Sequence, residues 1–402
     1  METKKTKFEQ GLEKAWKDYL AEERKKKYPN IMLIGVTGAG KSDLINRVLD
    51  AEVAKISDNA RATFGYCNFY DGHLYGRKVN FIDTEGYELG QSEEYLQNIS
   101  NAVNANYDGS PVHVIWYCIS VANERIEPID FRILKALKNL DTIHGRICIV
   151  FTKCDKDDKD STREKAIKQA LRNNELGNVP TFEVSNDPKL PLQLVDLIRW
   201  SSNQLDDEDF RESFIGSQMV DLERKRKEAE EIINAACLSV GALKLAEKVL
   251  SSDMEKRLAE HQMKMVMRIF SVYGIDCLEG ITKKFEKSTS LVSFGSGIVI
   301  YLTKTIPMIE KYQDYMQIGA ATALTKAVGK VASKLSYSYV EKHINGTPVK
   351  LEQFYSDPTS GGTLALLIDA VISESGEKLQ GDEEQKTTPV KKTSKKKKKK
   401  KF

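Results

Sequence analysis

The segment GVTGAGKS at residues 35–42 constrains this chain most, because it fits the pattern G-x-x-x-x-G-K-[ST]. Its glycines let the backbone wrap around a phosphate with successive N–H groups pointing inward. Lys41 is placed to reach the β- and γ-phosphates of a nucleotide, and the Ser42 hydroxyl is placed to ligate Mg²⁺. Residues 31–34 predict a buried strand before the loop, and residues 43–49 predict a helix whose N-terminal dipole adds to the anion site. A glycine-rich turn that binds nothing is the alternative, and the order of strand, loop and helix disfavours it. The predicted phosphate cradle comprises Gly35, Thr37, Gly38, Ala39, Gly40, Lys41 and Ser42.

A second motif, D-x-x-G at residues 83–86, lies at the end of a strand predicted at residues 80–83. We expect Asp83 to hold Mg²⁺, usually through water, and the Gly86 N–H to meet the γ-phosphate. The same residue pattern also occurs in ordinary surface turns. The prediction therefore depends on the position of the motif after the phosphate loop and at a strand end.

A third motif, T-K-C-D at residues 152–155, follows the buried strand predicted at residues 146–151. The carboxylate of Asp155 can accept hydrogen bonds from both the ring N–H and the exocyclic N–H of guanine. Adenine presents no such pair of donors, so an unpaired Asp155 in the pocket would disfavour ATP. Thr152 opens the motif, and the stem of Lys153 can lie along the base plane. Three motifs in this order, each at a strand end, predict a guanine-nucleotide site.

In these motifs the chain resembles the translation-factor-related P-loop GTPases, the Era-like branch in particular, over residues 28–203. The resemblance implies an α/β G domain with a mostly parallel six-stranded sheet flanked by helices. It also implies GTP or GDP and Mg²⁺ as ligands, and hydrolysis of GTP. The last nucleotide loop of the family is matched by Ser185 and Asn186. Asn186 replaces the usual small residue, and its backbone N–H is expected to reach the guanine oxygen.

The resemblance further implies a threonine in the first switch, and Thr63 is the best match. Thr63 would join Ser42 and Asp83 as a metal ligand. It would also join Lys41 and Gly86 at the catalytic centre. Only the resemblance to the family implies these roles for Thr63.

Departures from the family pattern concern the hydrolytic step. The second switch, D-T-E-G, lacks the usual stiffening proline. Tyr87 stands where Ras-like enzymes place a glutamine that orients the attacking water. Gly38 stands where potassium-activated Era-like enzymes place an asparagine. We therefore expect slow intrinsic hydrolysis, with self-association or a partner supplying the missing group. Three arginines could stabilise charge, although a solvated surface side chain is the stronger interpretation for each: Arg61, Arg77 and Arg125.

The length of 402 residues predicts two domains with tails. The first residues are charged and lead into a helical pattern, so no signal peptide is expected. The cysteines have no metal-ligand spacing, which indicates a reducing cytosolic chain that uses thiols as small apolar side chains. They are Cys67, Cys118, Cys148, Cys154, Cys237 and Cys277.

Apolar residues at a spacing of four predict an amphipathic helix over residues 5–26, with a stripe of Phe8, Leu12, Trp16 and Leu20. We expect this stripe to pack on the second domain or on the back of the G domain in preference to entering a membrane. The predicted division is an N-terminal helix at 1–27, a G domain at 28–204, a polar linker at 205–214, a helical domain at 215–375 and a disordered tail at 376–402.

The second half of the chain is predicted to be helical over residues 220–250, 254–285 and 317–344, with a final apolar helix at 363–373. An apolar segment at 291–302 is too short to span a membrane. This half resembles the helical YcjF-like domain found behind some bacterial G domains. The resemblance rests on residues 272–274, 305–307 and 320–329, and it implies no site residue. Some members of that family are membrane-associated.

Residues 377–402 contain eleven lysines and four acidic residues, a net charge of +7. Because the whole chain has a formal charge of +3, residues 1–376 carry −4. The unbroken lysine run at 395–401 predicts contact with an anionic surface, either acidic lipid or RNA. A flexible solubility tail without a partner is the alternative.

Together these features predict a GTP-hydrolysing molecular switch in the cytoplasm. Peripheral association with the inner face of a membrane is a further option. Its expected partners are a guanine nucleotide, a second copy bound through the G domain and a protein effector. The alternative is a GTP-binding scaffold that does not hydrolyse its nucleotide and is anchored to an anionic membrane or to RNA.

Overall fold

The computed structural model describes residues 7–23, 25–54, 60–63, 67–86, 92–122, 126–140, 146–185, 187, 189–190, 192–246, 252–275 and 316–348. Several predictions lie outside these residues. They are the apolar segment at 291–302, the helix at 363–373, the tail at 376–402, Arg125, Tyr87 and Asn186. For Phe8, Leu12, Trp16 and Leu20 only the backbone falls within the described part.

Seven strands of the described residues form one sheet in the order β2-β3-β4-β1-β5-β6-β7. The strands β4, β1, β5, β6 and β7 are parallel, whereas β3 pairs antiparallel with both β2 and β4. Their bounds are β1 Asn30–Ile34, β2 Ala60–Thr63, β3 Cys67–Tyr70, β4 Asn80–Thr84, β5 Val114–Ser120, β6 Ile147–Thr152 and β7 Thr181–Glu183.

The expected α/β P-loop fold with a mostly parallel sheet is confirmed, but the sheet has seven strands and not six. The additional strand is β2, which the sequence motifs place within a switch loop. It forms the sheet edge by pairing with β3, with Ala60 opposite Tyr70 and Thr63 opposite Cys67. Its sequence, ARAT, has no apolar run, so its strand character depends on this pairing.

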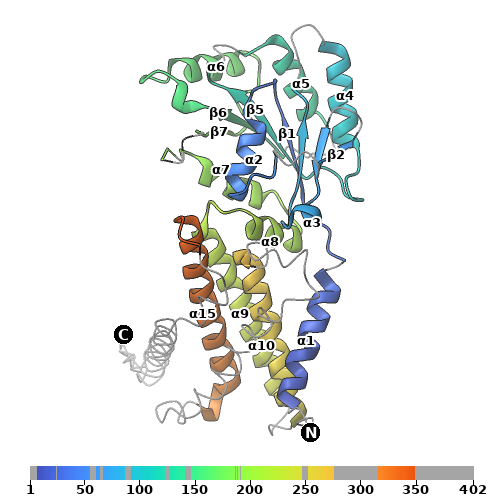
Figure 1. The fold of residues 1–402 in the computed structure, drawn as a ribbon, viewed down its shortest axis with the longest axis vertical. Coiled ribbons are helices and arrows are strands. Elements are labelled where there is room, and N and C mark those ends of the chain that lie inside the picture. The colour runs from blue at the N-terminus through green and yellow to red at the C-terminus, as the bar shows by residue number, and fades with distance from the viewer. Residues whose placement is uncertain are drawn as a thin grey trace, which may run out of the picture.

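Helices cover both faces of the sheet, and the strand residues alternate between them (Figure 1). One face packs on α4 Ser92–Asn104, α5 Pro128–Lys138 and α6 Thr162–Asn173, with Ile115 and Tyr117 of β5 pointing to it. The other packs on α2 Lys41–Leu49 and α7 Leu194–Asn203, with Val114 and Trp116 pointing to it. All seven residues of β5 are buried, as expected for a central parallel strand. The short helix α3 Gly72–Tyr75 precedes β4.

The helical body below the sheet contains α8 Glu208–Ser217, α9 Leu222–Ala246, α10 Ser252–Tyr273 and α15 Met316–Ile344 (Figure 1). The N-terminal helix, α1 Lys7–Glu23, packs along α10, and its Ala15 and Tyr19 belong to the same apolar cluster as Met263 and Phe270. Thus α1 lies on the helical body although the G domain separates the two in sequence. No described helix is both long enough and apolar enough to cross a membrane.

Most of the stretch predicted as a polar linker, residues 205–214, is helical and belongs to α8. The Asp207 side chain accepts a hydrogen bond from the Phe210 N–H and caps this helix, and Glu208 and Asp209 follow in its first turn. Acidic residues stabilise a helix N-terminus through the helix dipole, so the acidic run begins a helix. Within α8, Phe214 packs in the cluster under the sheet and Ile215 in that of the helical body.

A buried ion pair joins the G domain to two helices of the body. Lys78, just before β4, has a fully buried side chain, and its Nζ lies 2.9 Å from Oε2 of Glu23 at the end of α1. The same ammonium donates to Ser271 Oγ of α10 at 2.7 Å. The Lys78 N–H also donates to Ser217 Oγ at 2.7 Å, and the Met219 N–H donates to the Val48 carbonyl of α2 at 2.8 Å. The elements that carry the phosphate loop and D-x-x-G therefore contact the helical body at their opposite ends.

Candidate nucleotide-binding site

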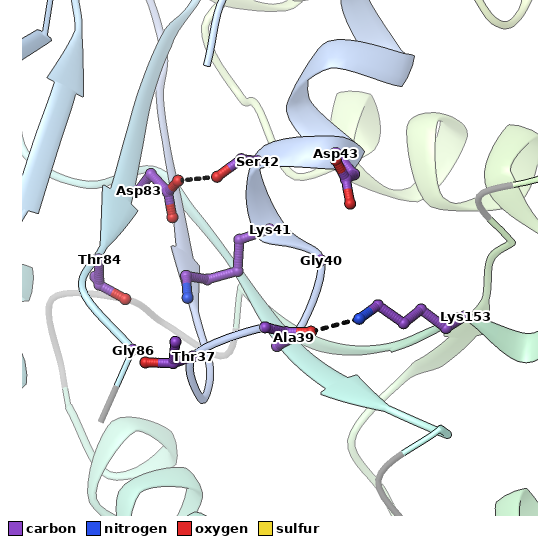
Figure 2. A pocket seen from close by; sticks show the side chains of 11 residues that line it. Thr37, Ala39, Gly40, Lys41, Ser42, Asp43, Asp83, Thr84, Gly86 and Lys153 are labelled. Atoms are coloured by element: carbon purple, nitrogen blue, oxygen red, sulfur yellow. Dashed lines mark hydrogen bonds between the residues drawn. The ribbon is translucent and has the colours of Figure 1, made fainter. Parts of the chain in front are cut away.

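A cavity of about 380 Å³ opens beyond the carboxyl ends of β1 and β4, the edge at which open α/β sheets bind their ligands (Figure 2). It brings together the first two motifs of the sequence and the lysine of the third. Its lining residues are Thr37, Gly38, Ala39, Gly40, Lys41, Ser42, Asp43, Asp83, Thr84, Gly86 and Lys153.

The phosphate loop has the conformation that its sequence predicts. Gly40, the residue before α2, has φ 83°, a left-handed value that a side chain would strain. It directs the chain into α2, whose N-terminal N–H groups face the cavity. Lys41 is buried, and its Nζ donates to the carbonyls of Gly35 at 3.1 Å and Val36 at 3.4 Å. The ammonium points into the middle of the cavity, where it can exchange these carbonyls for a phosphate (Figure 2).

Ser42 and Asp83 form the part of the cavity that suits a metal ion. The Ser42 hydroxyl donates to Asp83 Oδ2 at 2.7 Å. Asp83 Oδ1 is buried and has no hydrogen-bond partner among the described residues. Burial raises the pKa of the Asp83 carboxyl, and the Lys41 charge and the Ser42 hydrogen bond oppose that shift only in part. A hard oxygen without a partner, beside a hydroxyl, fits Mg²⁺, which prefers such ligands.

The D-x-x-G loop packs directly on the phosphate loop. A Cβ atom added at Gly86 would lie 2.0 Å from the backbone nitrogen of Thr37, closer than any side chain could fit. Only glycine allows this contact between the two loops. The γ-phosphate side of the cavity is thus bounded by backbone of both motifs.

The T-K-C-D motif is tied to the phosphate loop by two hydrogen bonds. The Thr152 hydroxyl donates to the Ala39 carbonyl at 2.6 Å. Lys153 Nζ donates to the Gly38 carbonyl at 2.7 Å, the bond that Figure 2 draws from Lys153. Lys153 adopts a left-handed φ of 57° before the short 3₁₀ helix Cys154–Lys156. These contacts fix the end of β6 relative to the phosphate site.

Asp155 and Ser185 meet beyond Lys153, as a base site requires. The Ser185 hydroxyl donates to Asp155 Oδ1 at 2.9 Å and accepts from the Asp187 N–H at 2.9 Å. Ser185 is buried, so these two bonds hold the carboxylate in one orientation. Asp155 Oδ2 lies 3.1 Å from Nζ of the exposed Lys156.

Thr63 is not brought to the cavity. The strand register places its backbone opposite Cys67, which in turn lies opposite Thr84. Two strand spacings, about 10 Å, therefore separate it from the end of β4. The metal-ligand role that the family implies for Thr63 would require residues 60–63 to move toward Asp83.

Two lining residues, Asp43 and Thr84, were not named from the sequence. Asp43 directly follows the phosphate loop and Thr84 lies inside D-x-x-G, so closer attention to the variable and flanking positions of the motifs could have found them. The Thr84 hydroxyl donates to the Leu33 carbonyl at 2.9 Å and joins β4 to β1 at the cavity wall. Arg77 is buried at the opposite end of β4, where it donates to the Leu49 carbonyl, and is remote from the cavity.

Comparisons with known proteins agree with this site. A family model described as "50S ribosome-binding GTPase" matches residues 30–153. The "Probable GTP-binding protein EngB" of Caldanaerobacter subterraneus subsp. tengcongensis is 30% identical over 173 residues, which cover 40% of this chain and 77% of EngB. The family match ends at residue 153, so the Era-like branch and the YcjF-like helical half stay predictions.

Two solved structures were also matched. A bacterial selenocysteine-specific elongation factor EF-Sec is 18% identical, with a TM-score of 0.32, over 45% of this chain and 29% of its own. This chain thus spans less than a third of that elongation factor. Toc33 from Arabidopsis thaliana, in complex with GDP and Mg²⁺, is 15% identical with a TM-score of 0.32, over 50% of this chain and 93% of its own. At these scores neither likeness bears on function. The identity to EngB over most of its length, with the family match, shows that this chain belongs to the P-loop GTPases.

Proposed function

We propose that this protein is a GTP-hydrolysing molecular switch. The observation that carries the proposal is the cavity that joins Lys41, Ser42, Asp83 and Gly86, with the Asp155–Ser185 pair beside it. The first four residues would hold the phosphates and Mg²⁺, and the last two would select guanine. Members of the family generally hydrolyse GTP, which supports the enzymatic part of the proposal.

In this proposal each residue has a defined task. The ammonium of Lys41 leaves the loop carbonyls and neutralises charge on the β- and γ-phosphates. The Ser42 hydroxyl and the unpartnered Asp83 oxygen would hold Mg²⁺. When bound, this ion would supply electrostatic stabilisation of the charge that develops on the transferred phosphoryl group. The Gly86 N–H senses the γ-phosphate, and hydrolysis releases that contact.

Discrimination between guanine and adenine falls to Asp155. The Ser185 hydroxyl uses one lone pair of Asp155 Oδ1 and leaves further acceptor sites for the base. Adenine lacks both of these donors, so Asp155 would gain no hydrogen bond from that base, which disfavours ATP.

No side chain is assigned to orient water, since Tyr87 stands where Ras-like enzymes have a glutamine. We expect slow turnover that a second copy or another protein accelerates. The test is phosphate release from GTP at several protein concentrations. Release above the buffer background, with a specific rate that rises with protein concentration, supports a switch that acts through self-association.

The second candidate is a GTP-binding scaffold that does not hydrolyse its nucleotide. The distance of Thr63 from the metal site favours it, because an incomplete first switch would leave hydrolysis uncatalysed. Phosphate release at background for every protein concentration, with GTP retained on the protein, would favour this scaffold over the switch.

We further propose that the chain consists of a G domain at residues 28–204 and a helical domain at residues 215–375, and that α1 packs on the helical domain. The helical domain would bind an effector, and the lysine-rich tail would bind acidic lipid or RNA in the cytoplasm. Deleting residues 386–402 tests the tail. Unchanged sedimentation with acidic liposomes and with total RNA, at low and at physiological salt, would remove it from the mechanism.

A further inference from the structure

Tyr95, near the start of α4, reaches the D-x-x-G loop from outside the sequence motifs. Its hydroxyl donates to the carbonyl of Glu85 at 3.3 Å. Tyr95 is buried in the apolar cluster that α4 and α5 form with the sheet. Burial raises the pKa of this hydroxyl, although a hydrogen bond with Thr84 opposes the shift, so the hydroxyl stays protonated at neutral pH. The Glu85 carbonyl is thus held by a donor that belongs to the core of the G domain.

The Glu85 carbonyl and the Gly86 N–H belong to one peptide group. This group is planar and trans, so its N–H points away from its carbonyl. The carbonyl faces Tyr95 and the apolar cluster, whereas Gly86 lines the cavity and lies against Thr37 of the phosphate loop (Figure 2). A donor on the carbonyl therefore fixes the direction in which this N–H is presented to the cavity.

The first two residues of D-x-x-G are held by other elements. Asp83 accepts from the Ser42 hydroxyl of α2 at 2.7 Å, and the Thr84 hydroxyl donates to the Leu33 carbonyl of β1 at 2.9 Å. The bond from Tyr95 comes instead from α4, which carries none of the motif residues. A shift of α4 can therefore turn the last peptide of D-x-x-G while the phosphate loop stays in place.

We propose that Tyr95 is a positioning residue that couples helix α4 to recognition of the γ-phosphate: by holding the Glu85 carbonyl, it directs the Gly86 N–H at that phosphate. The inference rests on the proposed function, in which the Gly86 N–H contacts the γ-phosphate. Because GDP lacks this phosphate, the hydroxyl should affect the binding of GTP and not that of GDP. The bond is longer than the usual O–H···O distance of about 2.7–2.8 Å, so its loss should change the stability of the fold little.

The test removes this hydroxyl alone, in Tyr95→Phe, which keeps the ring in the apolar cluster. The non-hydrolysable GTP analogue GppNHp and GDP each compete with a fluorescent GDP analogue at constant Mg²⁺. The affinity for GppNHp relative to GDP should fall about fivefold, the worth of one ordinary hydrogen bond, with GDP affinity changed less than about twofold.

Tyr107→Phe is the matched control, because it removes the same kind of bond from the same apolar cluster. The Tyr107 hydroxyl donates to the Ala102 carbonyl at 3.0 Å. Tyr107 lies at the amino end of β1, opposite the cavity, where its own carbonyl accepts from the Asn30 side chain. This variant should leave the relative affinity for GppNHp at the wild-type value.

A double variant tests whether Tyr95 acts through the Gly86 N–H. Gly86→Ala already displaces that N–H, so adding Tyr95→Phe should lower the relative affinity for GppNHp less than about twofold further. An equal loss in both backgrounds overturns the inference. A Tyr95→Phe protein whose relative affinity matches that of Tyr107→Phe overturns it as well.

The affinity for GDP separates positioning from folding in the same titrations. A Tyr95→Phe protein that loses GDP and GppNHp affinity equally overturns the inference, because the hydroxyl would then support only the fold. A wild type that binds neither nucleotide overturns the proposed function, and this inference with it. If wild type binds both and Tyr95→Phe keeps the wild-type ratio, the inference alone is wrong.

Discussion

Replacing Glu23 by glutamine should destabilise the protein strongly, because it leaves the Lys78 ammonium buried without its carboxylate. The Lys78 side chain is 0% exposed, and its Nζ lies 2.9 Å from Glu23 Oε2. Burial raises the pKa of Glu23, but the charges of Lys78 and Lys26 outweigh it and the pKa is lowered. Breaking one partner of such a buried pair costs about 3–5 kcal/mol of unfolding free energy. The contribution is present above the ordinary glutamate pKa of 4.5 and is lost as the pH falls through the lowered value.

The assay is urea unfolding at pH 7, followed by circular dichroism for wild type, Glu23→Gln and the double variant Glu23→Gln/Lys78→Met. The double variant should recover most of the loss, since no unpaired charge remains. A matched control exists on the same two helices. Lys14 of α1 lies 3.2 Å from Glu260 of α10, with 55% of its side chain exposed, so Lys14→Met should cost less than about 1 kcal/mol.

If Glu23→Gln shifts the unfolding midpoint no more than Lys14→Met does, the junction between α1, the G domain and α10 is hydrated. The same result would show that the pair does not fix α1 in place. A double variant as unstable as Glu23→Gln alone would also contradict the reasoning, because the loss would then come from packing.

Three further predictions concern His113, Gly86 and the proposed metal site of Asp83 and Ser42. Burial and the Arg146 charge lower the pKa of His113 from 6.5 to about 4, so wild type should lose up to about 3 kcal/mol of unfolding free energy as the pH falls from 6.5 toward 4. Urea midpoints for His113→Gln, which can still accept from the Asn30 N–H, should vary less over that range. Gly86→Ala should reduce phosphate release about 100-fold, because its Cβ would meet the Thr37 nitrogen at 2.0 Å and displace the Gly86 N–H. Because the pKa of Asp83 is raised, GTP affinity in the presence of Mg²⁺ should fall as the pH drops and Asp83 becomes protonated. Ser42→Ala should weaken the Mg²⁺ dependence of GTP binding at least about tenfold, measured in titrations with and without EDTA.

Different results would contradict these three predictions. A His113→Gln protein as sensitive to acid as wild type would show that other groups carry the pH dependence. Phosphate release by Gly86→Ala within about threefold of wild type would mean that the Gly86 N–H does not act on the γ-phosphate. Mg²⁺ dependence retained in Ser42→Ala would place the metal elsewhere in the cavity.

The parts of the site that could be predicted from sequence are those held by local spacing. Lys41, Ser42, Asp83, Gly86 and Lys153 each lie within a short motif at a strand end, and a parallel sheet gathers strand ends at one edge. Their convergence follows from that geometry. No contact between distant residues had to be known.

The parts that were wrong or missed depend on distant contacts. Strand β2 exists through its pairing with β3, and α8 begins with an acidic run that resembles a linker when its cap is not considered. Lys78 meets Glu23 only in the folded chain, although the two are far apart in sequence. Local patterns contain no information about such pairs.

Guanine selection by Asp155 defines which nucleotide the protein binds, and one competition measurement tests it. GTP and ATP compete with a fluorescent GDP analogue for the wild-type protein and for Asp155→Asn at constant Mg²⁺. We predict that ATP binds wild type at least about 1,000-fold more weakly than GTP, and that Asp155→Asn loses most of its GTP affinity. ATP binding within about tenfold of GTP, or GTP binding left intact in Asp155→Asn, would contradict the account.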